Sequence, residues 1–193
     1  MATIQILNRE TLSHKKYPLQ NIRFEKPDAT GKFHTLEKEV YFRPDAVAVL
    51  LVDDKYKKIL LGRQFRLPAF LNGSDKGYLV ETCAGIIDEG ETEEQTAYRE
   101  VEEETGYQIT NLNKIGGVYT SVGGSTEFVH LFTANYDSNG QHGNGGGLAA
   151  EGEDIELIEM GLDEAKEKLK QGWFIEAKTI LLLQHFFLNY PTS

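Results

Sequence analysis

The most constraining feature of this chain is the segment from residue 85 to residue 106, which reads GIIDEGETEEQTAYREVEEETG. From Asp88 to Glu104 it carries nine acidic residues and one basic residue, Arg99, a net charge of −8 in a chain whose total is −10. The acidity of the protein is therefore concentrated at one place. Like charges at this density repel each other and need compensation, most simply from divalent cations.

The same segment predicts a helix and both of its ends. Residues 92–95 read TEEQ, which has the form of a capping box and predicts a helix start near Glu93. Gly106 predicts the end, because glycine readily adopts the left-handed conformation that terminates helices. One stripe of this helix is apolar and is expected to pack against a sheet. That stripe consists of Ala97, Tyr98 and Val101.

A second stripe of the helix gathers carboxylates. At about 100° per residue, Glu100, Glu103 and Glu104 fall within about one third of the circumference. Glu102 points elsewhere and is expected to be solvated. Three carboxylates at this spacing destabilise an isolated helix, so we expect a bound ligand to hold them there. Carboxylate oxygens suit Mg²⁺ or Mn²⁺, and such ions usually bridge to phosphate oxygens.

A solvated acidic surface helix is the alternative interpretation, and a run of three glutamates alone would favour it. Four further residues at fixed offsets argue against it, namely Gly85, Glu91, Arg99 and Gly106. With them, residues 85–107 resemble the signature of the Nudix hydrolases, G-x5-E-x7-R-E-U-x-E-E-x-G-U, in which U is a bulky apolar residue. Every fixed position matches, and the last U is filled by Tyr107, which is bulky but carries a hydroxyl group.

The composition is that of an ordinary globular protein of one domain, or one domain with an appendage: 193 residues, 40% hydrophobic and 26% charged. Cys83 is the only cysteine, so no intramolecular disulfide can form, and we expect a reducing, cytoplasmic location. No basic segment followed by an apolar run opens the sequence, and no stretch approaches the ~20 apolar residues of a membrane span. A pI near 5.0 argues against nucleic acid as a partner.

The apolar runs predict an α+β fold. Residues 1–43 contain extended runs at 21–25 and 33–42 around a turn at 27–31, which predict a small antiparallel sheet too thin to be stable alone. Residues 44–193 are expected to form the main domain. Its strands are expected at 46–52, 58–65, 77–83, 115–120, 127–136 and 155–160, its later helices at 162–171 and 177–188, and a glycine-rich loop at 138–152. A mixed sheet with helices outside gives the α/β/α sandwich that the resemblance also implies.

Outside the signature, the chain resembles the nucleotide-sugar branch of the Nudix family over nearly its full length, and most closely its bacterial GDP-mannose hydrolases. The matching segments are residues 38–41 (KEVY), 63–66 (RQFR), 81–85 (ETCAG), 123–127 (GGSTE), 145–147 (GGG) with 153–156 (EDIE), and 178–179 (KT). Hydrolases of ADP-ribose share RQFR and often have proline where Cys83 stands, so Cys83 favours GDP-mannose. The resemblance implies Mg²⁺-dependent hydrolysis of GDP-mannose to GMP and mannose 1-phosphate, with cleavage of ADP-ribose to AMP and ribose 5-phosphate as the alternative.

The carboxylates of Glu100, Glu103 and Glu104 are the candidate ligands for Mg²⁺, with Mn²⁺ as a substitute. The resemblance adds the backbone carbonyl of Ala84 and the carboxylate of Glu153. Two or three such ions would neutralise a bridging diphosphate and activate a water for in-line attack on phosphorus.

The catalytic candidates are Glu103, Glu104, Glu153 and Arg99. The resemblance makes Glu153 a further metal ligand or the base that accepts the water's proton. The loop before it is two residues longer than in the hydrolases of comparison, which leaves Glu151 as the alternative. Arg99 is expected to pair with Glu91 or another acid and to orient the site.

The substrate-binding candidates also follow from the resemblance. Ala84 and Gly85 lie where the backbone approaches closely, because glycine lacks a side chain. Arg66 is expected to contact the diphosphate, Glu127 the sugar or phosphate end, and Lys178 the phosphate or terminal sugar. Relatives exchange their N-terminal strands across a homodimer, which implies contacts to the nucleotide of the neighbouring subunit. The residues expected to make them are Tyr17, Lys38, Glu39 and Val40.

A non-catalytic protein that senses a nucleotide sugar is the alternative class of function. Sensors of that type typically lose signature acids and carry a DNA-binding segment. Here every signature acid is present, and the sequence offers no basic recognition helix. The simpler interpretations of single residues also stay open: Arg66 could pair with a surface acid, the glycine-rich loop could be a passive linker, and Cys83 could be a buried packing residue.

Overall fold

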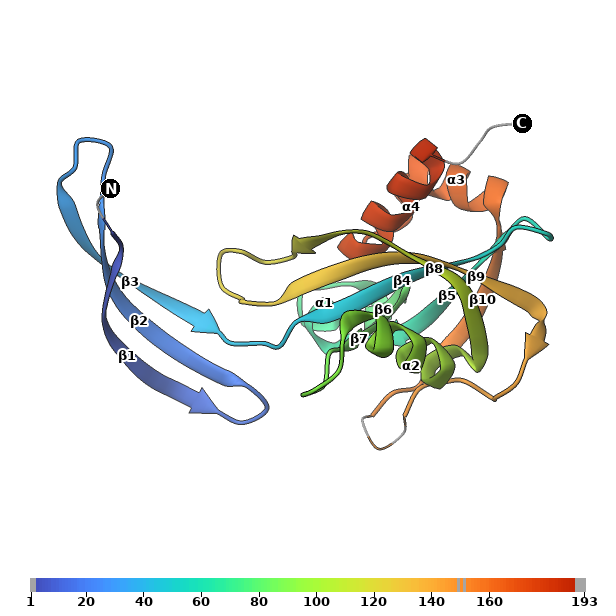
Figure 1. The fold of residues 1–193 in the computed structure, drawn as a ribbon, viewed down its shortest axis with the longest axis horizontal. Helices are drawn as coiled ribbons and strands as arrows, with labels where there is room; N and C mark the ends of the chain where they lie inside the picture. The colour runs from blue at the N-terminus through green and yellow to red at the C-terminus, as the bar shows by residue number, and fades with distance from the viewer. Residues whose placement is uncertain (1–2, 149, 151, 190–193) are drawn as a thin grey trace. The chain divides into compact units, whose positions relative to one another are not determined.

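The structure is a computed structural model that describes residues 3–148, 150 and 152–189. The chain separates into two compact units (Figure 1). The first consists of Met1–Asp45 with Tyr119–Phe128, and the second of Ala46–Val118 with Val129–Ser193. The division of the chain into domains at residue 43 stays a prediction.

The first unit contains a three-stranded antiparallel sheet in the order β1-β2-β3. Its strands are β1 (Gln5–His14), β2 (Pro18–Pro27) and β3 (Phe33–Tyr41). The turn between β2 and β3 forms where the sequence predicts it, because the Asp28 carboxylate accepts hydrogen bonds from the Thr30 N–H at 2.8 Å and the Lys32 N–H at 3.1 Å. Residues 121–126 join this unit through hydrogen bonds between the Tyr41 backbone and the backbones of Gly124 and Thr126.

The second unit is built on a mixed sheet, which among the described residues has seven strands. The main order is β10 (Glu156–Gly161), β5 (Lys58–Phe65), β4 (Ala46–Asp53), β9 (Phe128–Gln141) and β8 (Tyr107–Tyr119). In addition, β6 (Tyr78–Glu81) pairs with β5, and β7 (Cys83–Ile86) pairs with β4. Strand β4 runs parallel to β9 and antiparallel to β5 and β7.

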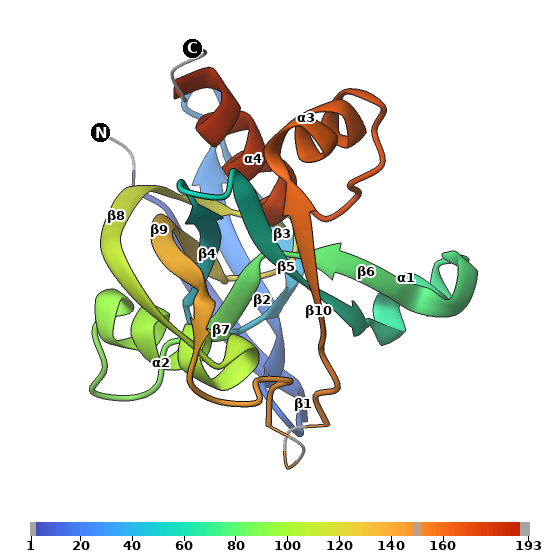
Figure 2. The same cartoon turned by 90° about the vertical axis from the view of Figure 1, so that its right-hand side faces the viewer.

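Helices cover both faces of this sheet (Figures 1 and 2). All eight residues of β4 are buried, and its side chains alternate between two apolar clusters. Val47, Val49 and Leu51 share a cluster with residues of α2 (Glu93–Thr105). Ala48, Leu50 and Val52 share the other with residues of α3 (Leu162–Lys170) and α4 (Ala177–Asn189). A strand buried on both faces between two helical layers defines the expected α/β/α sandwich.

Two expectations about the elements are wrong, and three elements were not expected. The strand expected at 77–83 is two strands, because β6 pairs with β5 and β7 with β4, while the Thr82 N–H between them donates to the Thr179 hydroxyl at 2.9 Å. Tyr98 does not pack on the sheet; it is 47% exposed, whereas Ala97 and Val101 are fully buried. The sequence also gave no expectation for β1 or for the short helices α1 (Leu67–Leu71) and η1 (Asp75–Gly77).

Candidate active site

Helix α2 begins and ends where the sequence predicts. The Thr92 hydroxyl accepts a hydrogen bond from the Gln95 N–H at 3.2 Å, and the Gln95 side-chain oxygen accepts one from the Thr92 N–H at 2.9 Å. This confirms the capping box. Gly106 has φ of 71°, in the left-handed region, and ends the helix. The capping box and Gly106 therefore define where α2 begins and ends.

Gly85 allows α2 to approach β7 closely, as the sequence predicts. A Cβ atom at Gly85 would lie 1.8 Å from the carboxyl carbon of Glu100, a distance at which no side chain fits. On the neighbouring residue, the Ala84 N–H donates to the Glu104 carboxylate at 3.3 Å. Two carboxylates of α2 are thus held directly against the backbone of β7.

Arg99 links several acids of the site. Its Nε donates to Glu91 at 3.0 Å, and its Nη1 donates to Glu100 at 2.9 Å and to Glu103 at 3.0 Å. Its Nη2 reaches the Ile86 carbonyl at 3.2 Å. The pairing of Arg99 with Glu91 is confirmed, and these hydrogen bonds raise the pKa of the guanidinium above its ordinary value.

Two of the carboxylates lie in a poorly solvated, negatively charged environment. Burial, together with the nearby carboxylates of Glu100 and Glu153, raises the pKa of the Glu104 carboxyl to about 8. Burial also raises the pKa of Glu100 to about 7, although Arg99 opposes the shift. The Cys83 thiol is buried next to Glu104, and burial raises its pKa well above the ordinary value. Cys83 is therefore not a nucleophile here.

The donor set fits a divalent cation. Hard carboxylate oxygens that lie close together without enough positive charge are the environment that such ions stabilise. Within the described residues, no group of three or more His, Cys, Asp or Glu side chains is already arranged to hold a metal. Arg99 forms ion pairs with Glu100 at 2.9 Å and with Glu103 at 3.0 Å.

Glu153 lies at the end of the glycine-rich loop and within electrostatic range of the α2 glutamates. Its carboxylate accepts a hydrogen bond from the Leu148 N–H at 2.9 Å. Its charge contributes to the raised pKa values of Glu100 and Glu104. Glu151, the alternative to Glu153, lies outside the described residues.

Arg66 and Lys178, expected to bind the substrate, each pair with an acid. Arg66 donates from Nε and Nη2 to the buried carboxylate of Glu81, at 3.0 and 2.7 Å respectively. Lys178 donates to the carboxylate of Glu176, which also accepts the Thr179 N–H at 2.8 Å. Both cations are thus fixed by neighbours, and their substrate contacts stay predictions.

The first unit holds the remaining site residues. Lys38 and Val40 line a pocket of about 430 Å³ together with Ile22, Phe24 and residues 122–125. Arg43 connects Tyr17 and Glu127, a link that the sequence did not predict. Its guanidinium lies 3.0 Å from the Glu127 carboxylate and 5.8 Å from the Tyr17 ring centroid. No sequence pattern marks Arg43, because its partners are distant in the chain. Glu39 is exposed near the end of β3, and its role stays a prediction.

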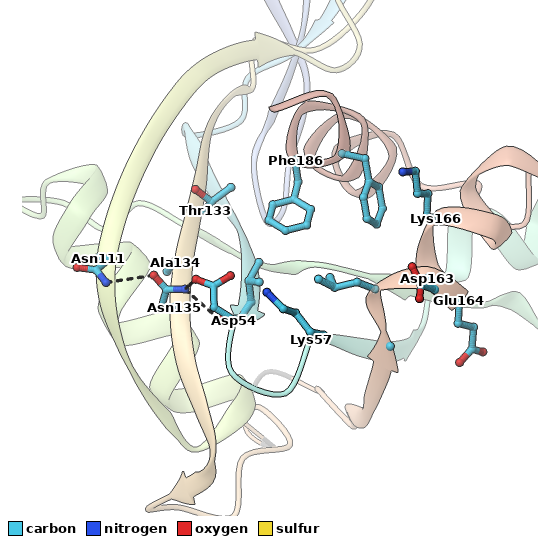
Figure 3. Close-up of a pocket in the computed structure, with 14 residues that line it drawn as sticks. Asp54, Lys57, Asn111, Thr133, Ala134, Asn135, Asp163, Glu164, Lys166 and Phe186 are labelled. Carbon is cyan, nitrogen blue, oxygen red and sulfur yellow. Dashed lines mark hydrogen bonds between the residues drawn. The ribbon is translucent and has the colours of Figure 1, made fainter. Parts of the chain in front are cut away.

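The second unit also has a cavity of about 980 Å³ on the side of α3 and α4 (Figure 3). None of the site residues expected from the sequence lines it. One wall is a hydrogen-bonded row in which the Asn111 amide donates to Asn135 at 3.1 Å and the Asn135 amide donates to Asp54 at 2.8 Å. Charged residues of both signs line it, including Lys57, Lys166, Asp163 and Glu164. We therefore place the candidate active site at α2, where buried acids of one sign converge.

The fold and this site together define a Nudix-type hydrolase. The NUDIX domain family matches residues 42–183, more than half of the chain, and the chain belongs to this family. Nudix hydrolases generally need a divalent metal ion. No helix among the described residues is long and apolar enough to span a membrane.

The chain is similar over almost its whole length to proteins named GDP-mannose pyrophosphatase. The protein from Cronobacter sakazakii is 40% identical over 186 residues, which is 96% of each chain. The protein from Escherichia coli O157:H7 is 36% identical over 187 residues, 97% of this chain and 96% of that protein. A solved structure described as an ADP compounds hydrolase has a TM-score of 0.70 over 94% of this chain and 91% of its own, at 20% identity, and supports the fold.

Proposed function

We propose that this protein hydrolyses the pyrophosphate bond of GDP-mannose, with Mg²⁺, to GMP and mannose 1-phosphate. The observation that carries the proposal is the cluster of α2 carboxylates, in which Glu100 and Glu104 lie against the Ala84–Gly85 backbone and Glu103 is joined to Glu100 through Arg99. The similarity to GDP-mannose pyrophosphatases over 96% of the chain supports the choice of substrate.

The four glutamates Glu100, Glu103, Glu104 and Glu153 would hold the ions, together with the backbone carbonyl of Ala84. Bound Mg²⁺ would neutralise the diphosphate and lower the pKa of a water beside it. Because α2 is anchored at both ends, its carboxylates need little rearrangement to act as ligands. Arg99 supplies positive charge next to Glu100 and Glu103.

The remaining residues would bind, orient or transfer a proton. Glu153 would accept the proton of the attacking water, with Glu103 as the alternative acceptor on the helix. Arg99 would orient Glu103 through its contact at 3.0 Å. Arg66, fixed by Glu81, would donate to a phosphate oxygen, and a cation already held in place loses less conformational entropy on binding.

The protein would act as a homodimer. Tyr17 and residues 38–40 of one subunit would contact the nucleotide bound by the other, and Glu127, held by Arg43, would contact the sugar or phosphate end. The exposed apolar side chains of the first unit support an interface of this kind, because a three-stranded sheet with so little burial is marginally stable alone.

A product assay in ¹⁸O-labelled water tests this function. The purified protein is incubated with Mg²⁺ and, separately, with GDP-mannose, ADP-ribose and UDP-glucose, and the products are identified by mass spectrometry. We expect GDP-mannose to be cleaved fastest and one product to carry the label. Faster cleavage of ADP-ribose would replace the proposed substrate, and no cleavage of any of the three would favour a binding protein.

Substitutions on α2 test the metal assignment. Glu103→Gln and Glu104→Gln each remove one ligand charge while keeping the size of the side chain, and we expect turnover to fall at least ~100-fold because the ions hold the transition-state charge. Glu102→Gln is the matched control, since Glu102 is exposed on the same helix turn. Circular dichroism should show all three variants folded. Near-normal turnover in both test variants would rule out the assignment.

A further inference from the structure

The C-terminal end of α2 is held by residues 141–147, which we call the glycine clasp. The last carbonyl groups of a helix have no partner within the helix. In this protein the four successive carbonyls of residues 103–106 all accept hydrogen bonds from the clasp. The pairs are Glu103 with the Gly147 N–H (3.3 Å), Glu104 with the Gly146 N–H (2.7 Å), Thr105 with the Gln141 side-chain amide (3.1 Å), and Gly106 with the His142 and Gly143 N–H groups (2.9 and 3.0 Å).

The contact between clasp and helix requires glycine. A Cβ atom at Gly145 would lie 2.6 Å from the carbonyl carbon of Thr105, and one at Gly106 would lie 2.3 Å from the carbonyl oxygen of Gly143. Both glycines also have positive φ, 61° and 71°, which L-residues with a side chain rarely adopt. The two backbones therefore meet directly, and the glycine-rich loop is docked on α2 instead of serving as a passive linker.

The clasp is also in contact with Glu153. The Leu148 N–H, which directly follows the clasp, donates to the Glu153 carboxylate at 2.9 Å. The Ile155 N–H returns a hydrogen bond to the Gly146 carbonyl at 3.1 Å. A Cβ atom at Gly147 would lie 2.5 Å from a carboxylate oxygen of Glu153. Gly147 thus touches Glu153 and, through its N–H, binds the backbone of Glu103.

We propose that the glycine clasp is a positioning device that holds the Glu153 carboxylate in register with the carboxylates of α2, and that Gly147 is its central residue. This inference rests on the proposed function, which gives Glu153 and the α2 glutamates a shared task. The connecting path runs from the Glu103 carbonyl to the Gly147 N–H, and along the backbone to the Leu148 N–H, which donates to the Glu153 carboxylate. Such rigid support keeps metal ligands and catalytic groups in their working positions.

The test compares Gly147→Ala with Gly152→Ala. Both glycines have φ of 77°, so each variant places a side chain in the left-handed region, but a Cβ at Gly152 has no atom within 4 Å. The first readout is binding of Mn²⁺ alone, followed by electron paramagnetic resonance without substrate. We expect Gly147→Ala to weaken Mn²⁺ binding by about tenfold or more, as is typical when the groups that orient metal ligands are disturbed. Gly152→Ala should change it less than about twofold, with a similar loss of melting temperature.

A double-mutant cycle separates positioning from general damage. If Gly147 acts through Glu153, then Gly147→Ala should lower kcat with GDP-mannose by about tenfold in the wild-type background but leave it unchanged in a Glu153→Ala background. Gln141→Leu provides a milder variant that removes one clasp hydrogen bond without backbone strain. We expect it to weaken Mn²⁺ binding about two- to fivefold, the effect of one modest hydrogen bond.

Several outcomes would overturn the proposal. They are wild-type Mn²⁺ affinity in Gly147→Ala, equal effects of Gly147→Ala and Gly152→Ala, or an undiminished loss of kcat in the Glu153→Ala background. If Gly147→Ala does not fold, wild-type affinity in Gln141→Leu would have the same consequence. Failure of the wild-type protein to cleave any nucleotide sugar would contradict the proposed function alone, because the Mn²⁺ titration needs no substrate.

Discussion

At the scale of single residues, Arg99 forms hydrogen bonds with most of the acidic groups around it. Its hydrogen bonds reach three carboxylates and one backbone carbonyl from a side chain that is about one quarter exposed. A guanidinium can do this because its five N–H donors lie in a fixed plane, whereas an ammonium is a point charge with three donors. The geometry of the carboxylates therefore depends on arginine in particular.

We expect Arg99→Lys to lower kcat/KM by about 10- to 100-fold, because lysine cannot bind Glu91 and Glu103 together. The measurement is steady-state kinetics with GDP-mannose at saturating Mg²⁺. Arg23→Lys, which alters an exposed ion pair with Glu37 in the first unit, is the control and should leave kcat/KM within about twofold. Equal activity in Arg99→Lys and the wild type would show that positive charge alone is sufficient.

Asp53 gives a prediction about pH. Its carboxylate accepts hydrogen bonds from the N–H groups of Lys55 and Tyr56 at 3.0 Å and of Ser138 at 2.9 Å, and the residue is only 3% exposed. Burial alone would raise its pKa, but the hydrogen bonds outweigh burial and hold the pKa below its ordinary value. A lowered folded-state pKa adds stability above the pKa of the unfolded chain, and this stability is lost as the pH falls through the folded-state pKa.

Asp53→Asn should therefore destabilise the protein at pH 7 by about 1–2 kcal/mol, because the amide oxygen cannot accept from all three donors and one partly buried N–H loses its partner. Urea unfolding at pH 7 and at successively lower pH measures the effect. The difference from the wild type should shrink as the pH falls below the ordinary range of aspartate. Asp54→Asn is the control, since Asp54 is exposed and its replacement can still accept from Asn135. A difference that is independent of pH would contradict this account.

The site residues that could be predicted from the sequence are those for which the reaction requires both a particular residue type and a particular spacing along the chain. Glu91 lies just before α2, and Arg99 and the glutamates lie on it. Their spacing in the sequence therefore determines their relative positions in space. Arg43 and Gln141 could not be found in this way. Arg43 meets Glu127 and Gln141 meets Thr105 only because the chain folds back over 84 and 36 positions, and neither residue type is unusual where it stands.

At the scale of elements, buried strands could be predicted from the sequence more accurately than exposed ones. Strands β4 and β5 are buried and apolar, and their bounds agree with the expected ones within one residue. Strand β1 is almost entirely exposed and lacks the alternation that marks a half-buried strand. Strand β8 was expected only at 115–120, although it begins at Tyr107 and its first residues alternate between buried and exposed. The break between β6 and β7 could not be predicted either, because it depends on a change of partner strand and on the distant Thr179.

Helix α2 was the most predictable element, since its capping box, its apolar stripe and its terminal glycine all agree. Such agreement between local and tertiary preferences favours a single structure. Tyr98 is the exception. It lies between the fully buried Ala97 and the partly exposed Arg99, and the face that packs on the sheet is narrower than the expected stripe.

At the scale of the whole molecule, the first unit leaves apolar surface that a monomer would not be expected to expose. Within residues 4–36, the large apolar side chains at 37% exposure or more are Ile4, Ile6, Leu7, Leu12, Phe33 and Leu36. Exposed apolar side chains that gather on one small sheet usually mark an interaction surface. Since three strands with few buried residues are marginally stable, a second copy of the chain would both cover this surface and stabilise the sheet.

We therefore expect the wild-type protein to sediment as a homodimer, and a variant with Ile6→Lys and Leu12→Lys to sediment largely as a monomer. Each substitution replaces an apolar contact by a charge that must be desolvated on association. Analytical ultracentrifugation at several concentrations measures the change. Glu10→Lys is the matched control, because it adds the same two units of positive charge to β1 without removing apolar surface. A monomeric wild type, or a double variant that dimerises as well as Glu10→Lys, would show that this sheet does not form the interface.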